Sequence, residues 1–98
     1  MIRVILPTYL QRLAQTDKEI HLHLEGDGSI GEVINLIETK YPMLKGTIRD
    51  HYSGERREYL RFFASGQDYS HHSLEAPLPL EVLEGREPLR IIGAMSGG

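Results

Sequence analysis

Apolar residues alternate with other residues in two segments near the start of the chain. Every second residue is apolar in 2–6 and again in 19–25, which is the period of a strand with one buried face. Pro7 ends the first strand because proline cannot donate to a sheet ladder. We expect the two strands to pair as a hairpin. Residues 8–17 carry few apolar residues at helical spacing, so we predict a wide loop or one helical turn there.

A single long helix is predicted for residues 30–40. Its apolar positions 30, 33, 34 and 37 form one stripe of an amphipathic helix. Ser29 and Glu32 have the spacing of a capping box, in which each side chain satisfies the other residue's backbone N–H. Tyr41-Pro42 ends the helix because the residue before a proline is displaced from the helical region.

The second half of the chain is predicted to add strands to the same sheet. Residues 45–60 hold two possible short strands around Ser53-Gly54, and a clearer strand at 60–64 turns at Ser65-Gly66. We predict a loop with one helical turn for residues 67–88 and a closing strand for residues 89–94. This order predicts an α+β fold, a mixed four- to five-stranded sheet with one main helix packed on one face. The first and last strands can pair in parallel at its centre.

Length, charge and composition exclude several classes of protein. The 98 residues suffice for one domain, and a net charge of −3 argues against a nucleic-acid or membrane-surface partner. No apolar run approaches the ~18 residues of a membrane span. The chain has no cysteine, which excludes a disulfide, a thiolate metal site and a thiol nucleophile. Its start does not resemble a signal peptide, so we expect a cytoplasmic protein.

The last four residues, Met95-Ser96-Gly97-Gly98, follow the closing strand. Two glycines here add nothing to a core, and glycine loses the most entropy on ordering. Because glycine has no side chain, the Gly97-Gly98 end of the tail suits a narrow enzyme channel. With the hairpin, the single helix and the closing strand, this tail resembles the ubiquitin-like β-grasp sulfur carriers of the MoaD/ThiS family, over nearly the whole chain.

The resemblance depends on four segments, which are the first strand, the helix ending at Tyr41-Pro42, residues 62–68 and residues 91–98. The Tyr41-Pro42-Met43-Leu44 turn and the long segment 45–59 are similar to the longer, CysO-type members. The chain departs from the family pattern at Ser65, where asparagine is usual, at 76–79, and at Met95-Ser96 before the glycines. The resemblance implies a ubiquitin-like β-grasp domain at 1–94 and a flexible tail at 95–98.

The resemblance also implies a function without catalysis by the chain itself. An E1-like adenylyltransferase of the MoeB/ThiF type would use ATP and Mg²⁺ to adenylate the Gly98 carboxylate. A sulfur donor enzyme would then supply the sulfur of a Gly98 thiocarboxylate. Gly97, Ser96 and Met95 would lie in the partner's channel. A downstream synthase would accept the sulfur for molybdopterin, thiamin, cysteine or a thio-metabolite. Some relatives carry residues beyond the glycines that a JAMM-type metalloprotease removes.

Two other functions fit the same features. A ubiquitin-like modifier would join Gly98 to lysines of target proteins by an isopeptide bond. A binding module with an incidental tail would bind its partner equally well without Gly97-Gly98. The sequence leaves all three functions open.

The alternation also predicts a docking face on the sheet. If the apolar residues at 2, 4, 60, 62, 89 and 91 face the helix, the opposite face gathers an apolar centre with arginines around it. Its members are Ile5, Phe63, Ile92, Arg3, Arg61 and Arg90. Apolar centres with nearby arginine are typical of interfaces. Alternatively, Phe63 and Ile92 fill a second small core beneath residues 67–88.

Other polar clusters predict no catalytic or metal site. The histidine pairs at 21/23 and 71/72 lack further ligands at metal-binding spacing. The glycines of 26–31 fit a tight strand-to-helix turn, without the lysine of a phosphate-binding loop. Arginines at 49, 56 and 57 alternate with acidic residues, as on a solvated hairpin. Ser65 and Ser96 have no identifiable general base, so we expect no enzyme activity and no bound cofactor.

Overall fold

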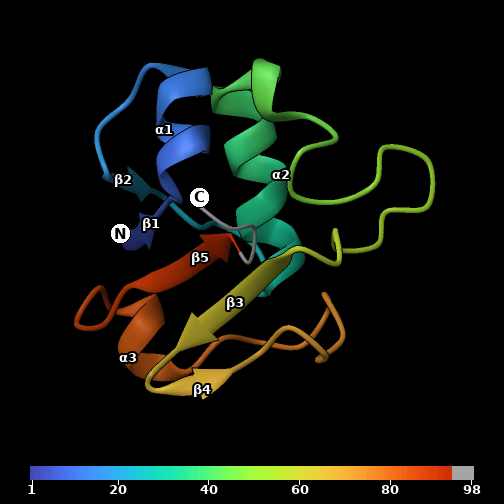
Figure 1. Cartoon of the computed structure of the whole chain (residues 1–98). Helices are drawn as coiled ribbons and strands as arrows, with labels where there is room; N and C mark the ends of the chain where they lie inside the picture. The colour runs from blue at the N-terminus through green and yellow to red at the C-terminus, as the bar shows by residue number, and fades with distance from the viewer. Residues whose placement is uncertain (94–98) are drawn as a thin grey trace.

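The computed structural model describes residues 1–93 as five strands and three α-helices, with one short 3₁₀ helix (Figure 1). The elements in chain order are β1 (Ile2–Ile5), α1 (Thr8–Ala14), β2 (Glu19–Leu22), α2 (Ile30–Lys40), η1 (Pro42–Leu44), β3 (Leu60–Ala64), β4 (Gln67–Asp68), α3 (Leu80–Leu83) and β5 (Leu89–Gly93). The strands form one sheet in the order β2-β1-β5-β3-β4. The pair β1–β5 is parallel and the other pairs are antiparallel. The predicted mixed α+β sheet is confirmed, with parallel β1 and β5 at its centre.

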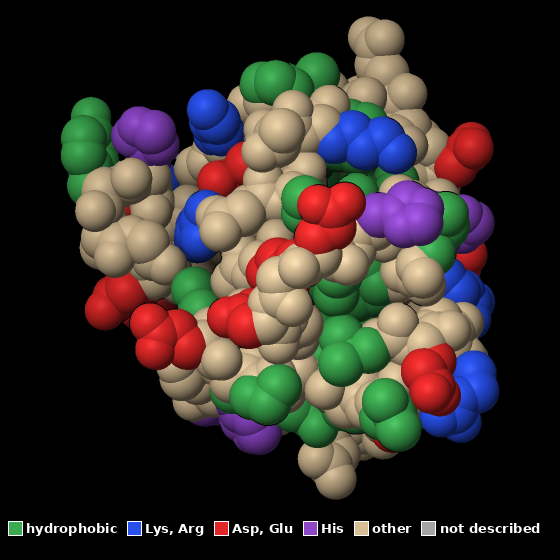
Figure 2. Space-filling view, turned by 180° about the vertical axis from the view of Figure 1, so that it is seen from behind, with side chains coloured by type: hydrophobic (Ala, Val, Ile, Leu, Met, Phe, Trp, Pro, Cys, Tyr) green, Lys and Arg blue, Asp and Glu red, His purple; other side chains and the backbone are tan. Residues whose placement is uncertain are grey.

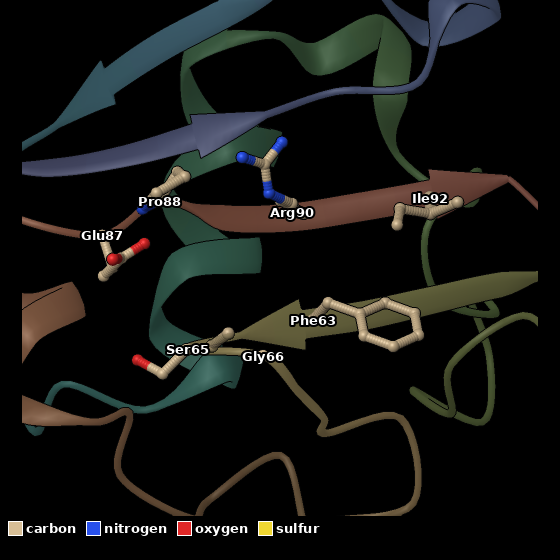
Figure 3. A pocket seen from close by; sticks show the side chains of 8 residues that line it. Phe63, Ser65, Gly66, Glu87, Pro88, Arg90 and Ile92 are labelled. Atoms are coloured by element: carbon tan, nitrogen blue, oxygen red, sulfur yellow. The ribbon is translucent and has the colours of Figure 1, made fainter.

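One hydrophobic core lies between the sheet and α2. Alternate residues of β1, β3 and β5 point into it, together with the apolar stripe of α2 predicted from its spacing. The fully buried side chains include Ile2, Val4, Leu60, Phe62, Leu89 and Ile91 from the strands, and Ile30, Val33, Ile34 and Ile37 from α2. Since α2 covers this side, the opposite side of the central strands carries the remaining alternate residues. Figure 3 shows that opposite side, with α2 behind the strands.

The start of α2 has the predicted cap, but only half of the predicted capping box. Ser29 Oγ accepts a hydrogen bond from the backbone N–H of Glu32 at 3.1 Å. The carboxylate of Glu32 instead accepts bonds from the backbone of Gly26 (2.6 Å) and Gly28 (2.8 Å). The N–H of Ser29 donates to Asp27 Oδ1 at 3.0 Å. The predicted bond from the Ser29 N–H to the Glu32 carboxylate was therefore wrong. The loop before the helix wraps around the Glu32 carboxylate, and its Asp27 accepts the Ser29 N–H instead.

The prediction of a loop or one turn at 8–17 was wrong, because α1 extends for seven residues. It begins after Pro7 and ends at Gln15, whose φ of 53° is left-handed. Leu10 and Ala14, four residues apart, are its buried residues. Two apolar contacts on one face suffice here because the core stabilises a helix too short to be stable alone.

The segment 45–59 forms turns and a single isolated bridge between Arg49 and Arg56, instead of two short strands. The N–H of Asp50 donates to the carbonyl of Glu55 at 2.7 Å. The Asp50 carboxylate accepts the N–H groups that follow it in the turn, including that of Tyr52 at 2.9 Å. These local bonds satisfy the backbone without a strand partner. The segment projects from the body in Figure 1.

The segment 67–88 contains the predicted helical turn, α3, and also a short strand that the sequence did not predict. Ser65 and Gly66 have φ of 51° and 76°, and they join β3 to β4. Two consecutive left-handed residues are the geometry of a tight hairpin turn, which pairs the residues on either side. The closing strand β5 is observed at Leu89–Gly93. The last residue of the predicted strand, Ala94, lies outside the described residues.

Candidate functional site

The outer face is our name for the side of β1, β5 and β3 opposite α2. It carries the six residues that the sequence analysis assigned to a docking face, namely Arg3, Ile5, Arg61, Phe63, Arg90 and Ile92. The three strands lie side by side in the sheet, as expected. Alternate residues of each strand are buried against α2, whereas these six are half-buried or exposed. The structure therefore places the six residues together on one accessible surface.

The strand register places Arg90 inside the apolar part of the outer face. Arg90 pairs with Ile5 across β1–β5 and with Phe63 across β3–β5. The row continues to Glu19 beside Ile5 and to Asp68 beside Phe63. The sequence had suggested three arginines around one apolar centre, but Arg90 separates Ile5 from Phe63. Alternation assigns a side chain to a face, and only the register decides its neighbours.

The other two arginines of the outer face have carboxylate partners. Arg3 contacts Glu19 through two bonds, Nη2 to Oε1 at 3.0 Å and Nε to Oε2 at 3.2 Å. Arg61 Nη1 lies 3.3 Å from Asp68 Oδ2. The hydrogen bond from Arg3, followed by that from His21, lowers the pKa of Glu19 to about 2. Glu19 and Asp68 thus neutralise Arg3 and Arg61 at the two ends of the row.

Arg90 has no ion pair and no side-chain hydrogen bond among residues 1–93. It is exposed, and it borders a hollow of about 220 Å³. The hollow is lined by Phe63, Ser65, Glu87, Pro88, Arg90 and Ile92, among others. In Figure 3 the Arg90 side chain stands out from β5, with Phe63 and Ile92 to one side and Glu87 to the other.

The alternative of a second small core is not found among the described residues. Phe63 and Ile92 belong neither to the buried cluster nor to the side chains packed against it, and Ile92 is 44% exposed. The segment 67–88 instead sends Leu78 and Val82 into the main core. The apolar side chains of the outer face therefore remain accessible.

The last described residue of the central strand β5 is Gly93. A Cβ at Gly93 would lie 3.1 Å from Cε1 of Tyr9 and 3.7 Å from Cβ of Pro7. The Tyr9 ring thus occupies the space of a side chain, which favours glycine at this position. The predicted tail residues Met95, Ser96, Gly97 and Gly98 lie outside the described residues.

Several other polar side chains of residues 1–93 bond within the fold. No group of three or more His, Cys, Asp or Glu in this range could hold a metal ion. Arg49 pairs with Glu38 at 2.9 Å, and Arg56 donates to the carbonyl of Leu60 at 2.6 Å. Ser65 Oγ bonds to Glu81 Oε1 at 2.5 Å. These contacts give Arg49, Arg56 and Ser65 partners within the fold.

Sequence reasoning missed Glu19 and Asp68 as part of this surface. A signal for Asp68 was present, because a two-residue turn at Ser65-Gly66 pairs Ala64 with Gln67 and Phe63 with Asp68. No comparable signal fixed Glu19, since the connection between β1 and β2 is long, contains α1 and leaves their register open.

The back of the molecule has a mixed surface. Figure 2 shows acidic and basic side chains interspersed there, with hydrophobic side chains among them. Such interspersion does not form the single-sign field that attracts nucleic acid. Within residues 1–93, no helix is both long and apolar enough to cross a membrane.

No protein-family model matches the sequence, and no curated protein matches it by sequence. Solved structures match it by fold. A chain in the Amycolatopsis orientalis BexX/CysO complex aligns with a TM-score of 0.76 and 19% identity, covering 100% of both chains. CysO from Mycobacterium tuberculosis, described as an antigen, aligns with a TM-score of 0.74 and 21% identity, covering 97% of this chain and 100% of that one. Small archaeal modifier protein 1 (SAMP1) from Haloferax volcanii aligns with a TM-score of 0.73 and 18% identity, covering 98% and 97%.

These alignments cover nearly the whole of each chain and show a shared fold. The ubiquitin-like β-grasp fold expected from the resemblance to MoaD/ThiS-type proteins is confirmed. The likeness to CysO also agrees with the predicted similarity to the longer, CysO-type members.

Proposed function

We propose that this chain is a sulfur carrier protein whose C-terminal Gly98 carboxylate is adenylated by an E1-like enzyme and converted to a thiocarboxylate. The observation that carries this proposal is the position of Gly97-Gly98 in the chain. The two glycines follow β5, a central strand in a sheet whose fold matches CysO. A tail that continues a central strand can extend from a rigid body into a partner's channel.

The proposed chemistry needs only a carboxylate from this chain. A carboxylate at a chain end is ionised at pH 7 and is a poor electrophile. Attack by its oxygen on the α-phosphorus of ATP·Mg²⁺ would form the Gly98 acyl-adenylate and release pyrophosphate. Attack by sulfide-level sulfur on the acyl carbon would then break the bond to AMP and leave the thiocarboxylate. The activating enzyme supplies ATP and Mg²⁺, so the carrier itself needs no bound cofactor.

The proposal assigns the outer face to partner docking. Its accessible apolar side chains, Ile5, Phe63 and Ile92, are suited to a protein interface. The expected partners are an E1-like adenylyltransferase of the MoeB/ThiF type, a sulfur donor enzyme and a downstream synthase. A JAMM-type metalloprotease joins them if the precursor extends beyond Gly98. The BexX/CysO complex supports a protein partner, because there a protein of this fold is bound to another protein.

A ubiquitin-like modifier is the second candidate, favoured by the structural match to a small archaeal modifier protein. In that case the Gly98 acyl group would pass to a lysine amine of a target protein, forming an isopeptide bond. Sulfur would then not remain on Gly98.

The test is the intact mass of the chain isolated from its own source, before and after treatment with a thiol-alkylating reagent. A carrier is expected to show one oxygen replaced by sulfur and then to gain one alkyl group. Because the chain has no cysteine, the thiocarboxylate would be the thiol-like group that reacts. The same masses would establish whether Gly98 ends the mature chain.

Two tail variants are the controls. Deletion of Gly98 and Gly97→Trp are expected to abolish adenylation, measured as ATP–pyrophosphate exchange, while circular dichroism and thermal unfolding stay unchanged. Normal adenylation of either variant would contradict the proposal. A chain that stays an unalkylated acid with ATP, sulfide and source extract, but appears in conjugates, would favour the modifier instead.

A further inference from the structure

We propose that Arg90 selects the activating partner, by requiring a carboxylate among the apolar side chains of the partner's docking segment. This inference depends on the proposed function, because it concerns the same outer face. It adds the chemical character of the partner's docking segment and names the residue that recognises this segment.

The first argument is the charge balance of the outer face. Arg3 and Arg61 are neutralised by Glu19 and Asp68, at opposite ends of the same row. Arg90 lies between them and has no carboxylate within ion-pair distance among residues 1–93. Glu19 and Asp68 are each two strands away from Arg90, or about 10 Å at the usual strand spacing. The centre of the face therefore carries a guanidinium without an ion-pair partner among residues 1–93, and Glu87 is the carboxylate that borders the same hollow.

The second argument is the environment that a partner would create. Arg90 is flanked by Ile5 on one strand and Phe63 on the other. A partner that covers these apolar side chains would also remove water from the guanidinium. Burying a charge is unfavourable unless it is paired, so the partner must supply an anion at this point. A partner with an apolar group or a cation there would bind more weakly, which provides specificity as well as affinity.

The third argument concerns which anion fits. A guanidinium presents a planar fork of N–H donors that matches a carboxylate. Glu87 borders the same hollow as Arg90, so it repels additional negative charge. A single uncompensated arginine next to an acidic residue suits one carboxylate and disfavours a polyanion. The geometry thus points to an Asp or Glu side chain of a protein partner, seated in the hollow beside Phe63 (Figure 3).

The test compares arginine variants as substrates of the E1-like adenylyltransferase from the same organism. Arg90→Gln is expected to raise KM by at least about tenfold, the cost of leaving a carboxylate unpaired, with little change in kcat. Arg90→Lys keeps the charge without the fork, so its KM is expected to lie between those of wild type and Arg90→Gln. Arg3→Gln is expected to have a smaller effect than Arg90→Gln, because Glu19 already compensates that charge.

Arg12→Gln is the matched control, because Arg12 is an exposed arginine on α1 and is not part of the outer face. Its KM is expected to remain that of wild type. The KM for Arg90→Gln should also become less different from wild type at high salt, where the ion pair is weakened.

The outcomes separate this inference from the proposed function. If wild type is adenylated and Arg90→Gln has an unchanged KM, Arg90 does not select the partner and the carrier function stands. If Arg90→Lys weakens binding as much as Arg90→Gln, the positive charge contributes nothing and the assignment to a carboxylate is wrong. If wild type is not adenylated, the proposed function fails and this inference fails with it.

Discussion

The two sides of β1, β5 and β3 use the same strands and differ in what covers them. On the inner side, α2 packs over alternate residues, and Val4, Leu60 and Leu89 are fully buried. On the outer side, the intervening residues of the same strands are half-buried or exposed. Consecutive residues therefore have opposite environments, and two neighbouring pairs have the same residue type, Phe62 with Phe63 and Ile91 with Ile92.

Because of this difference, the inner side contributes mainly to stability and the outer side is available for partner recognition. The inner side chains gain free energy from burial on folding, since transfer of apolar surface from water is the main favourable contribution. The outer side chains are half-buried or exposed, so they contribute less to folding and keep apolar surface available for burial by a partner. Phe62 and Phe63 allow the two contributions to be measured with one kind of substitution.

The largest expected effect is on folding. Phe62→Ala should lower the free energy of unfolding by about 3–5 kcal/mol, because it removes a fully buried aromatic ring and leaves a cavity. Phe63→Ala should lower it by less, about 1–2 kcal/mol, because Phe63 is only partly buried and its removal leaves no enclosed cavity. Urea unfolding of both variants measures the difference. Equal losses would mean that the outer face is packed in solution, and the comparison of the two sides would fail.

The second prediction concerns partner binding, for which Phe63 is expected to be the more important of the two phenylalanines. Phe63→Ala should raise the KM for adenylation by about tenfold or more, because aromatic side chains at the centre of an interface dominate binding. Tyr52→Ala is the matched control, since Tyr52 is 95% exposed in the projecting segment 45–59 and lies off the sheet. Its KM should equal that of wild type. A larger effect from Tyr52 than from Phe63 would move the docking surface to that segment.

The sequence predicted the two sides of the sheet where the local spacing of apolar residues determines which side chains are buried. The bounds of α2 (Ile30–Lys40) and β3 (Leu60–Ala64) agree with prediction, because each has a continuous apolar pattern and a clear end signal. Pro42 ends the helix and Ser65-Gly66 ends the strand. The faces of the strands followed from the same period, so the six residues of the outer face were identified together.

Features that depend on distant contacts were not predictable from one sequence. The helix α1 depends on two residues that bury against the core. The position of Arg90 between Ile5 and Phe63 is set by the registers of two strand pairs distant in sequence. For the same reason, Glu19, the ion-pair partner of Arg3, was identified only in the structure.

The smallest expected effect tests whether the outer face contributes to stability through its ion pairs. Hydrogen bonds from Arg3 and then His21 lower the pKa of Glu19 in the folded protein from 4.5 to about 2. A carboxyl whose pKa is lowered by folding stabilises the protein above its unfolded pKa and loses that contribution as pH falls through its folded pKa. Wild type should therefore lose this stabilisation between about pH 4.5 and 2, whereas Glu19→Gln should lack it throughout.

The measurement is urea unfolding of both proteins at several pH values across this window. The difference in unfolding free energy between wild type and Glu19→Gln should be largest above pH 4.5 and should shrink as the pH is lowered. It should also decrease with salt, because the pair is accessible to solvent. Glu55→Gln, on the projecting segment, serves as the control for the loss of a surface carboxylate. A difference that does not change with pH would show that Arg3 and Glu19 do not stabilise the fold through charge. The Arg3–Glu19 pair would then have no measured role in folding, and recognition would be left to explain it.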